Sequence, residues 1–371
     1  MTDISGVGID IHRSFYQVQV IDQDGVISGE PIPTGKEGES RLLDRLSDLA
    51  GPIVVAMEAC TGAYHLYNLV KDKVGQVLII DPTKLRERFP KKGKKTDKVD
   101  ATNLARLARM QDTDSNWIPP EPTRRLREIT NERCRVTEQS TMEMNRVHAK
   151  LKEYGFHWKG ASKRLWTGEG RKWLSKTMLE APEFIQLAIN LSLERLDLLW
   201  KQKKALEVAI CQEAMGSEEA KLLMTLPGVS AVGSAVILAE VGDWRRFDSA
   251  KQLASYAGLN PKVHQSANTC HYGSISRRGR KRLRWICVEL ALSAHQNCPQ
   301  LKAFHERIKK RSRCHGKAKV ATGRKLLTLC WHILRTGEPY RHEQAEKTAR
   351  KFQRVGARIR GRACAKGAIT R

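Results

Sequence analysis

The sequence predicts an α/β N-terminal domain followed by mainly helical regions, and three observations support this fold class. Apolar runs typical of strands alternate with amphipathic helical patterns before residue 112. A proline-rich break at 113–123 precedes long patterns of helical spacing. Lysine and arginine then become frequent, and apolar residues thin out, towards the C-terminus. We therefore expect an α/β domain at 1–112, a linker and helical coiled-coil region at 113–215, a mainly helical domain at 216–340 and a basic tail at 341–371.

The N-terminal elements follow from the spacing of apolar residues. Alternation predicts strands on either side of the turn residues 22–25, and an uninterrupted apolar run predicts a buried central strand. Apolar residues three and four apart predict the helices. The expected order is strands at 4–9, 15–21 and from 26, a helix at 36–49, a strand at 53–57, a helix from 61, a strand at 77–80 and a helix from about 97. This order indicates a mixed sheet covered by helices.

Four carboxylates stand at the ends of these elements. Asp10 follows the first strand and Glu58 follows the central one, and strand C-termini are where such sheets carry their chemistry. Asp97 and Asp100 are three residues apart at the start of a helix, so both lie on one face. An acidic first turn that only complements the helix dipole is the simpler alternative. Four acids from separate elements favour a metal site for phosphate chemistry.

The predicted middle region contains two long helical patterns, at 126–151 and 189–210. They indicate an antiparallel or an intermolecular helical pair. Between them, Trp158, Trp166 and Trp173 alternate with lysine and arginine. Interleaved aromatic and basic residues suit stacking on unpaired bases with phosphate contacts. An ordinary helix that buries tryptophan and solvates lysine fits equally well.

Near the start of the predicted C-terminal domain, Leu226–Gly233 resembles a helix-hairpin-helix turn, although a plain packing corner between helices explains it as well. Short helices at 235–241 and 250–257 follow. A polar loop bracketed by Pro261 and Gly273 then leads to a basic helix. A further helix is expected at 318–336, and the tail from 341 is expected to be disordered unless bound to nucleic acid.

Charge and cysteine usage limit the class of protein. Lysine and arginine number 66 against 40 aspartate and glutamate, a formal net charge of +26. Such an excess favours nucleic acid as the partner, because binding a polyanion releases its counterions. No apolar run reaches 18 residues and no signal pattern begins the chain, so we expect no membrane association. The nine cysteines are scattered without a Cys-x-x-Cys pair, which favours a reducing interior over a zinc knuckle or disulfide framework, and Cys314-His315 is expected to be a chance pair of neighbours.

Three N-terminal stretches together carry a family resemblance: Gly8 to His12 (GIDIH), Met57 to Tyr64 (MEACTGAY) and Lys95 to Ala101 (KTDKVDA). They resemble the DEDD catalytic domain of Piv-like insertion-sequence transposases, the family numbered one-ten with its eleven-eleven subgroup. That domain is similar to the Holliday-junction resolvase RuvC, of ribonuclease H-like fold. The resemblance implies that Asp10, Glu58, Asp97 and Asp100 bind divalent metal.

The C-terminal domain resembles the transposase domain of the same family, through its Gly-Leu-x-Pro turn at Gly258–Pro261 and the glycine-basic-leucine helix at 279–284. The resemblance implies that the serine after the turn, Ser266, is a nucleophile. Ser274 and Ser276 are the rivals if the loop aligns differently. The basic residues flanking the two chemical stretches are the predicted nucleic-acid contacts: Lys94, Lys95, Arg277, Arg278, Arg280 and Lys281.

Oxygen-only ligands favour Mg²⁺ or Mn²⁺, and a pair of such ions stabilises both the attacking and the leaving oxygen of a phosphodiester. With serine as attacker, a covalent phosphoserine keeps the bond energy for rejoining, so we expect a DNA recombinase with a composite metal-and-serine centre, and the family resemblance implies that it is RNA-guided. The family resemblance implies a structured non-coding bridge RNA that pairs with double-stranded target and donor DNA. Strand exchange implies a homo-oligomer, a dimer or tetramer.

Two other classes of protein remain open from the sequence. A metal-dependent hydrolytic nuclease, such as a junction resolvase, shares the acids without needing the serine, and a non-catalytic nucleic-acid-binding protein shares only the charge. The expected location is the cytoplasm of a prokaryotic cell, in association with the nucleoid.

Overall fold

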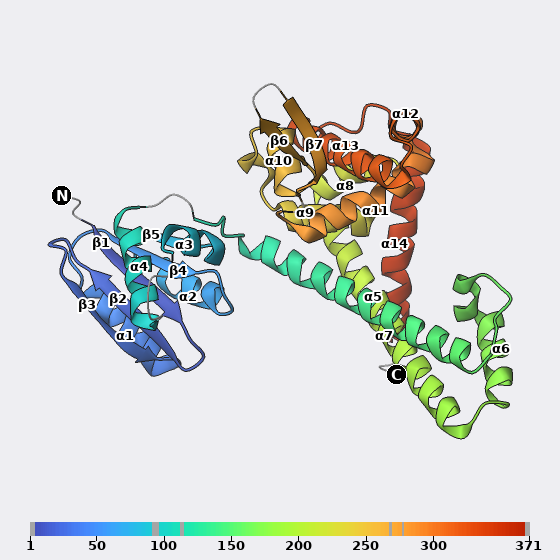
Figure 1. Cartoon of the computed structure of the whole chain (residues 1–371), viewed down its shortest axis with the longest axis horizontal. Helices are drawn as coiled ribbons and strands as arrows, with labels where there is room; N and C mark the ends of the chain where they lie inside the picture. Colours follow the sequence, from blue (N-terminus) through green and yellow to red (C-terminus); the bar gives the residue numbers. More distant parts are fainter. Residues whose placement is uncertain (1–3, 91–95, 112–114, 267–268, 277, 368–371) are drawn as a thin grey trace. The chain divides into compact units, whose positions relative to one another are not determined.

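The computed structural model describes residues 4–90, 96–111, 115–266, 269–276 and 278–367. The chain forms two compact units, Met1–Ile118 and Pro119–Arg371. Figure 1 shows a sheet with helices in the first unit and mainly helices in the second. The sequence predicted this α/β unit followed by mainly helical regions. Among the described residues, the helices are too short or too polar to cross a bilayer.

The first unit is built on a five-stranded mixed sheet. Its strands are β1 (Ser5–Ile11), β2 (Phe15–Ile21), β3 (Ile27–Pro33), β4 (Ile53–Glu58) and β5 (Gln76–Ile80). Their order is β3-β2-β1-β4-β5. The first three strands pair antiparallel through local connections, whereas β1, β4 and β5 run parallel. Each strand predicted from the alternation and the apolar runs is present.

Helices cover both faces of this sheet. On one face α1 (Lys36–Ser47) and α2 (Ala63–Val70) bury leucines against Val7, Ile9 and Val55. On the other face α3 (Pro82–Arg88) and α4 (Asp97–Arg109) cover Val54 and Ala56. The short helix α3 was not predicted. Its start is encoded by Asp81, whose side chain accepts a hydrogen bond from the Thr83 N–H, followed by proline at the first helical position.

Two glycines of β1 allow α4 to lie directly on the sheet. A Cβ at Gly8 would lie 1.9 Å from the Ala101 carbonyl oxygen, and one at Gly6 would lie 2.5 Å from that of Ala105. The backbones therefore approach closer than any side chain permits. Because Gly8 meets Ala101 while Gly6 meets Ala105, α4 runs antiparallel to β1. Its first turn consequently lies at the C-terminal end of that strand.

The predicted linker is partly ordered as an edge of the first unit. The Asn116 N–H donates to the Ile79 carbonyl at 2.7 Å, and the Ile79 N–H donates to the Ser115 hydroxyl at 3.0 Å. Ile118 packs against the core beneath α1 and α2. Segment 115–118 thus covers the open side of β5. The sequence did not indicate this pairing, because the segment lies in a proline-rich break.

The second unit begins with two long helices, α5 (Glu121–Glu153) and α7 (Glu183–Gly216), as predicted. Arg133 pairs with Glu207 at 2.8 Å, and Arg195 lies 3.6 Å from Glu143, so the helices are antiparallel within one chain. The segment between them contains a 3-10 turn at Ser162–Trp166 and α6 (Gly168–Met178). Its tryptophans are half-buried against the hydrophobic cluster at this end of the pair, which supports the ordinary-helix alternative.

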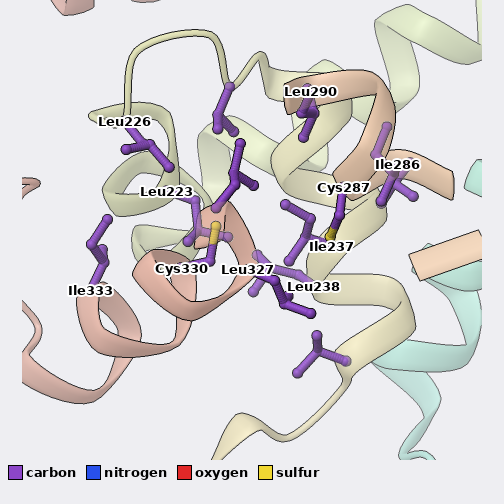
Figure 2. Close-up of a cluster of buried hydrophobic side chains, with 14 of the residues drawn as sticks. Leu223, Leu226, Ile237, Leu238, Ile286, Cys287, Leu290, Leu327, Cys330 and Ile333 are labelled. Atoms are coloured by element: carbon purple, nitrogen blue, oxygen red, sulfur yellow. The ribbon is translucent and has the colours of Figure 1, made fainter. Parts of the chain in front are cut away.

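The remaining elements form a helical bundle. They are α8 (Glu218–Met224), α9 (Ala231–Val241), a 3-10 turn (Trp244–Arg246), α10 (Ala250–Tyr256), β6 (Pro261–Ser266), β7 (Thr269–Ile275), α11 (Lys281–Asn297), α12 (Pro299–Ser312) and α13 (His315–Thr336). Figure 2 shows their shared core, in which α8, α9, α11 and α13 contribute side chains such as Leu223, Ile237, Leu290 and Leu327.

The basic tail is a helix, α14 (Ala345–Gly367), so the expectation of disorder was wrong for this segment. Phe352, Val355 and Ile359 recur three and four residues apart and pack against the core. The Lys351 ammonium donates to the carbonyl oxygens of Met224, Leu226 and Val229. A few apolar residues at helical spacing and the partly buried Lys351 attach α14 to the core. The average composition of residues 341–371 does not indicate this helix.

Candidate active site

Asp10 and Glu58 lie next to each other at the C-terminal edge of the sheet. Ile9 pairs with Met57 across the parallel strands β1 and β4, so the following residues are neighbours too. Side chains alternate along a strand, and Gly8 and Ala56 face α4. Asp10 and Glu58 therefore point to the face that α4 covers.

The first turn of α4 brings Asp97 and Asp100 to the same place. Thr96 caps the helix by accepting a hydrogen bond from the Val99 N–H at 3.3 Å. The charges of both aspartates act on Asp10, and those of Glu58 and Asp10 act on the neighbouring Cys60. The four acids predicted from sequence thus lie together at one end of the first unit.

His12 belongs to this cluster, and the sequence analysis gave it no role. Its Nε2 lies 3.1 Å from an Asp10 oxygen and 3.3 Å from an Asp97 oxygen, and its ring stacks on Phe15. The signal was present, because His12 is two residues after Asp10, immediately beyond the end of β1, and continued alternation would place it on the same side. His12 thus bridges the two carboxylates.

The electrostatics of Asp10 fit a cation site. Burial raises the pKa of its carboxyl group, and the charges of Asp100 and Asp97 raise it further, against the opposing effect of His12. One potential ligand atom each from Asp10, His12 and Asp97 lies within 4.8 Å of the others. Oxygen donors at this density suit a hard divalent ion, because its charge relieves the repulsion among the carboxylates.

Ser266 is the last residue of β6, where it pairs with Thr269 of β7. The backbone at Ser266 is described, whereas its side chain lies outside the described part of the structure. The expected polar loop is therefore a two-stranded hairpin. The sequence did not indicate these strands, because residues 261–266 and 269–275 contain few apolar residues. Of the rival serines, Ser274 is exposed in β7, and the Ser276 N–H donates to the Asn260 carbonyl at 2.8 Å.

The predicted nucleic-acid contacts differ in their surroundings. Lys94, Lys95 and Arg277 lie outside the described residues. Arg278 and Lys281 are exposed beside the N-terminus of α11. The Arg280 side chain donates from Nε to the buried Glu240 at 2.9 Å, which gives it a partner inside the bundle.

A further basic surface, which we call the turn groove, runs between α14 and the turn that joins α8 to α9. It encloses a cavity of about 690 Å³, with Pro227–Val232 on one side. Gly228 holds this turn tightly against α11, because its φ is 89° and an added Cβ would lie 2.4 Å from the Ala294 nitrogen. The basic side chains that line the cavity from α14 are Lys347, Arg350, Lys351, Arg354 and Arg358.

Comparisons with known proteins agree with this arrangement. A sequence model of DEDD transposases matches residues 7–156, and the model described as the transposase IS116/IS110/IS902 family matches residues 220–306. The chain is 26% identical over 364 residues to the transposase for insertion sequence element IS1111A of Coxiella burnetii, covering 92% of each chain. It is 26% identical over 289 residues to a protein named as a transposase in Sinorhizobium fredii, covering 77% of this chain and 70% of the relative.

The pilin gene-inverting protein of Moraxella bovis is 33% identical over 126 residues, which span 33% of this chain and 39% of that protein. The DEDD match includes the four acids of the first unit, and the second match includes the hairpin that carries Ser266. The chain therefore belongs to the IS116/IS110/IS902 family of transposases.

Proposed function

We propose that this transposase is an RNA-guided DNA recombinase that cuts and rejoins strands through a covalent bond to Ser266. The observation that carries the proposal is the meeting of Asp10 and Asp97 around His12, with Glu58 and Asp100 on the adjoining strand end and helix turn. Such a dense set of carboxylates on rigid elements is poorly suited to a purely structural role, because the acids repel one another. It suits phosphodiester chemistry supported by metal.

Asp10, Glu58, Asp97 and Asp100 would hold Mg²⁺ or Mn²⁺. The ion would supply positive charge to the phosphate oxygens and to the attacking and leaving oxygens. Asp10 has the most restricted position, because it sits on the central strand β1. Asp97 and Asp100 follow the position of α4, which Gly6 and Gly8 fix. His12 lies 3.1 Å from an Asp10 oxygen and 3.3 Å from an Asp97 oxygen, so it would stand beside the ion and help to position these two ligands.

Ser266 would act as the nucleophile in the same reaction. Its Oγ forms a bond to phosphorus, the bond from phosphorus to one deoxyribose oxygen breaks, and that oxygen takes up a proton. The serine proton passes to solvent or to a carboxylate. Reversal of this step by another deoxyribose hydroxyl rejoins the strand, so no external energy source is required.

The proposed partners are double-stranded target and donor DNA and a structured non-coding bridge RNA, bound by a dimer or tetramer. The turn groove supports nucleic-acid binding by the second unit, since its α14 side is a row of cations. Lys347 and Arg354 are exposed there and make no ion pair within the described residues. Such side chains are suited to phosphates and read no base sequence, which fits recognition delegated to a guide RNA.

A trapping assay tests the proposal. Purified protein is incubated with Mg²⁺, the non-coding RNA that flanks its gene, and end-labelled DNA with the matching sites, then denatured and separated. We expect labelled DNA attached to protein in the wild type and none with Ser266→Ala or Asp10→Asn. Ser274→Ala is the matched control, because it removes an exposed serine from the opposite strand of the same hairpin, and it should retain the adduct.

The same gel separates the alternatives. Cleaved DNA without an adduct, undiminished by Ser266→Ala, would show a hydrolytic nuclease and refute the serine step. An adduct that forms equally well without the RNA would refute guidance while leaving the covalent chemistry intact. Loss of the adduct with Ser274→Ala but not with Ser266→Ala would move the nucleophile to β7.

A further inference from the structure

Three helices of the second unit bring together histidines to which no role has been assigned above. His295 lies in the last turn of α11, His305 in α12, and His315 is the first residue of α13. The ring centroids of His295 and His305 are 4.5 Å apart, and those of His305 and His315 are 5.2 Å apart. Glu306 joins them, with one oxygen 3.7 Å from His295 Nε2.

The hydrogen bonds around His305 fix which ring nitrogen carries the proton. The Thr322 hydroxyl donates its single proton to the Ala318 carbonyl at 2.8 Å. The same hydroxyl oxygen lies 3.0 Å from His305 Nδ1, so it accepts the proton of that nitrogen. Nε2 of His305 therefore carries the lone pair. The fixed tautomer is the one that a metal ligand requires.

That lone pair is buried and unused. His305 is 1% exposed, and its Nε2 has no hydrogen-bond partner among the described residues. Nδ1 of His295 is also buried and also has no hydrogen-bond partner among the described residues. Folded proteins rarely leave buried polar atoms unpaired, so two such atoms in contacting rings indicate a missing partner.

The surroundings of His305 favour its neutral form, which is the form that binds a metal ion. Burial lowers the pKa of His305, and the neighbouring His295 and His315 lower it further, against a smaller opposing effect of Glu306. Lys309 also faces the cluster and lies 3.8 Å from Glu306. A doubly protonated ring here would carry a buried charge beside two further imidazoles and a lysine.

We propose that His295, His305 and Glu306 bind a zinc ion, with His315 placed to complete the coordination. One potential ligand atom each from the first three residues lies within 4.8 Å of the others, so small side-chain rotations bring them to zinc distances. Two imidazoles and a carboxylate favour Zn²⁺ over Mg²⁺, which prefers oxygen donors such as the acids of the first unit. The ion ties α11 to α12 across their corner at Cys298 and recruits the start of α13.

The test measures zinc on the full chain. Protein stripped with a chelator is titrated with Zn²⁺ in millimolar Mg²⁺, which occupies the acid cluster of the first unit. Bound zinc is counted by mass spectrometry, and the thermal midpoint and the visible absorption of a Co²⁺-substituted sample are recorded. We expect one saturable Zn²⁺ per chain, a raised midpoint, and Co²⁺ bands that indicate nitrogen ligands.

Variants locate the ion. Glu306→Gln and His295→Gln should each weaken zinc affinity by more than about 100-fold. Loss of a residue that only hydrogen-bonds to a ligand typically costs no more than about 100-fold, so a larger loss indicates a direct ligand. Both positions are partly exposed, so these variants test the site even if His305→Ala fails to fold. Glu289→Gln is the matched control, because it removes an exposed carboxylate from α11, the helix that carries His295, and it should leave zinc affinity unchanged. Glu289 lies 3.6 Å from Lys319 of α13.

Two results would overturn the zinc site. One is the absence of saturable Zn²⁺ binding in wild-type protein. The other is zinc binding that survives both Glu306→Gln and His295→Gln but is lost in Asp10→Asn, which would assign the ion to the first unit.

Discussion

The two units collect opposite charges by different structural means. In the first, the topology of the sheet gathers acids, because parallel strands end side by side and α4 rests on two glycines. In the second, the face of a single helix, α14, presents cations, and Ser266 stands at the end of a hairpin. Carboxylates repel one another, so rigid elements are needed to hold them close together. Cations that bind a polyanion can remain on an exposed helix face.

Removal of one acid should give the largest effect. Asp10→Asn should reduce DNA cleavage by about 10³-fold or more, as loss of a key charge-stabilising group does in other enzymes. Its fold should survive, and the metal-free variant should unfold at the same or a higher temperature than the wild type. The reason is that burial and the neighbouring aspartates raise the pKa of the Asp10 carboxyl group, so its ionised form destabilises the folded state.

Calorimetry with and without Mg²⁺ checks both halves of this prediction. The ion should raise the unfolding temperature of the wild type and have little effect on Asp10→Asn. Asp72→Asn, an exposed aspartate beyond the end of α2, is the control and should resemble the wild type throughout. A variant that loses activity because it unfolds at a lower temperature would contradict the view that the acids oppose folding.

The next effect concerns the support beneath the acids. Gly8→Ala should destabilise the first unit by about 3 kcal/mol, because the new Cβ would meet the backbone of α4 at 1.9 Å. Displacement of α4 should also weaken Mg²⁺ binding, since Asp97 and Asp100 move with it. Gly75→Ala is the control, as its Cβ would lie 3.3 Å from the nearest atom, the Ile53 carbonyl oxygen. Equal denaturation curves for the two variants would show that the sheet does not fix α4 in this way.

Much of the acid site was predictable because it depends on local periodicity. The strand that carries Asp10, the buried run ending at Glu58 and the capped turn with Asp97 each have a sequence signal that tertiary structure preserves. His12 was missed although it is two residues after Asp10, immediately beyond the end of β1. The helix α14 and the histidine cluster were missed for a different reason. They depend on interactions between residues distant in sequence, such as Lys351 with the 224–229 turn and His305 with Thr322, which periodicity does not reveal.

A smaller effect is expected at the turn groove. Lys347→Glu with Arg354→Glu should weaken binding of both duplex DNA and the flanking RNA, with little change in sequence preference. For duplex DNA, the slope of log affinity against log salt should become shallower by about 0.9 for each phosphate that the variant no longer neutralises. Lys71→Glu with Lys73→Glu changes the net charge equally on an exposed segment of the first unit and is the control. Identical salt slopes for the two double variants would show that the turn groove is not a specific binding surface and contributes only through the net charge.

The smallest effect should come from Lys351, the cation that attaches α14 to the turn. Burial lowers the pKa of its ammonium group from 10.5 to about 8, against an opposing effect of Glu343. Between about pH 8 and 10.5 the unfolded chain therefore holds more protons at this position than the folded chain. Stability from this group consequently increases as the pH rises through that range. The free energy of unfolding of the wild type and of Lys351→Met is measured at intervals from about pH 7.5 to about 10. The wild-type value minus the variant value should increase with pH. A difference that stays constant, or that shrinks, would mean that the three carbonyl hydrogen bonds stabilise the charged form of Lys351 at least as much as burial opposes it.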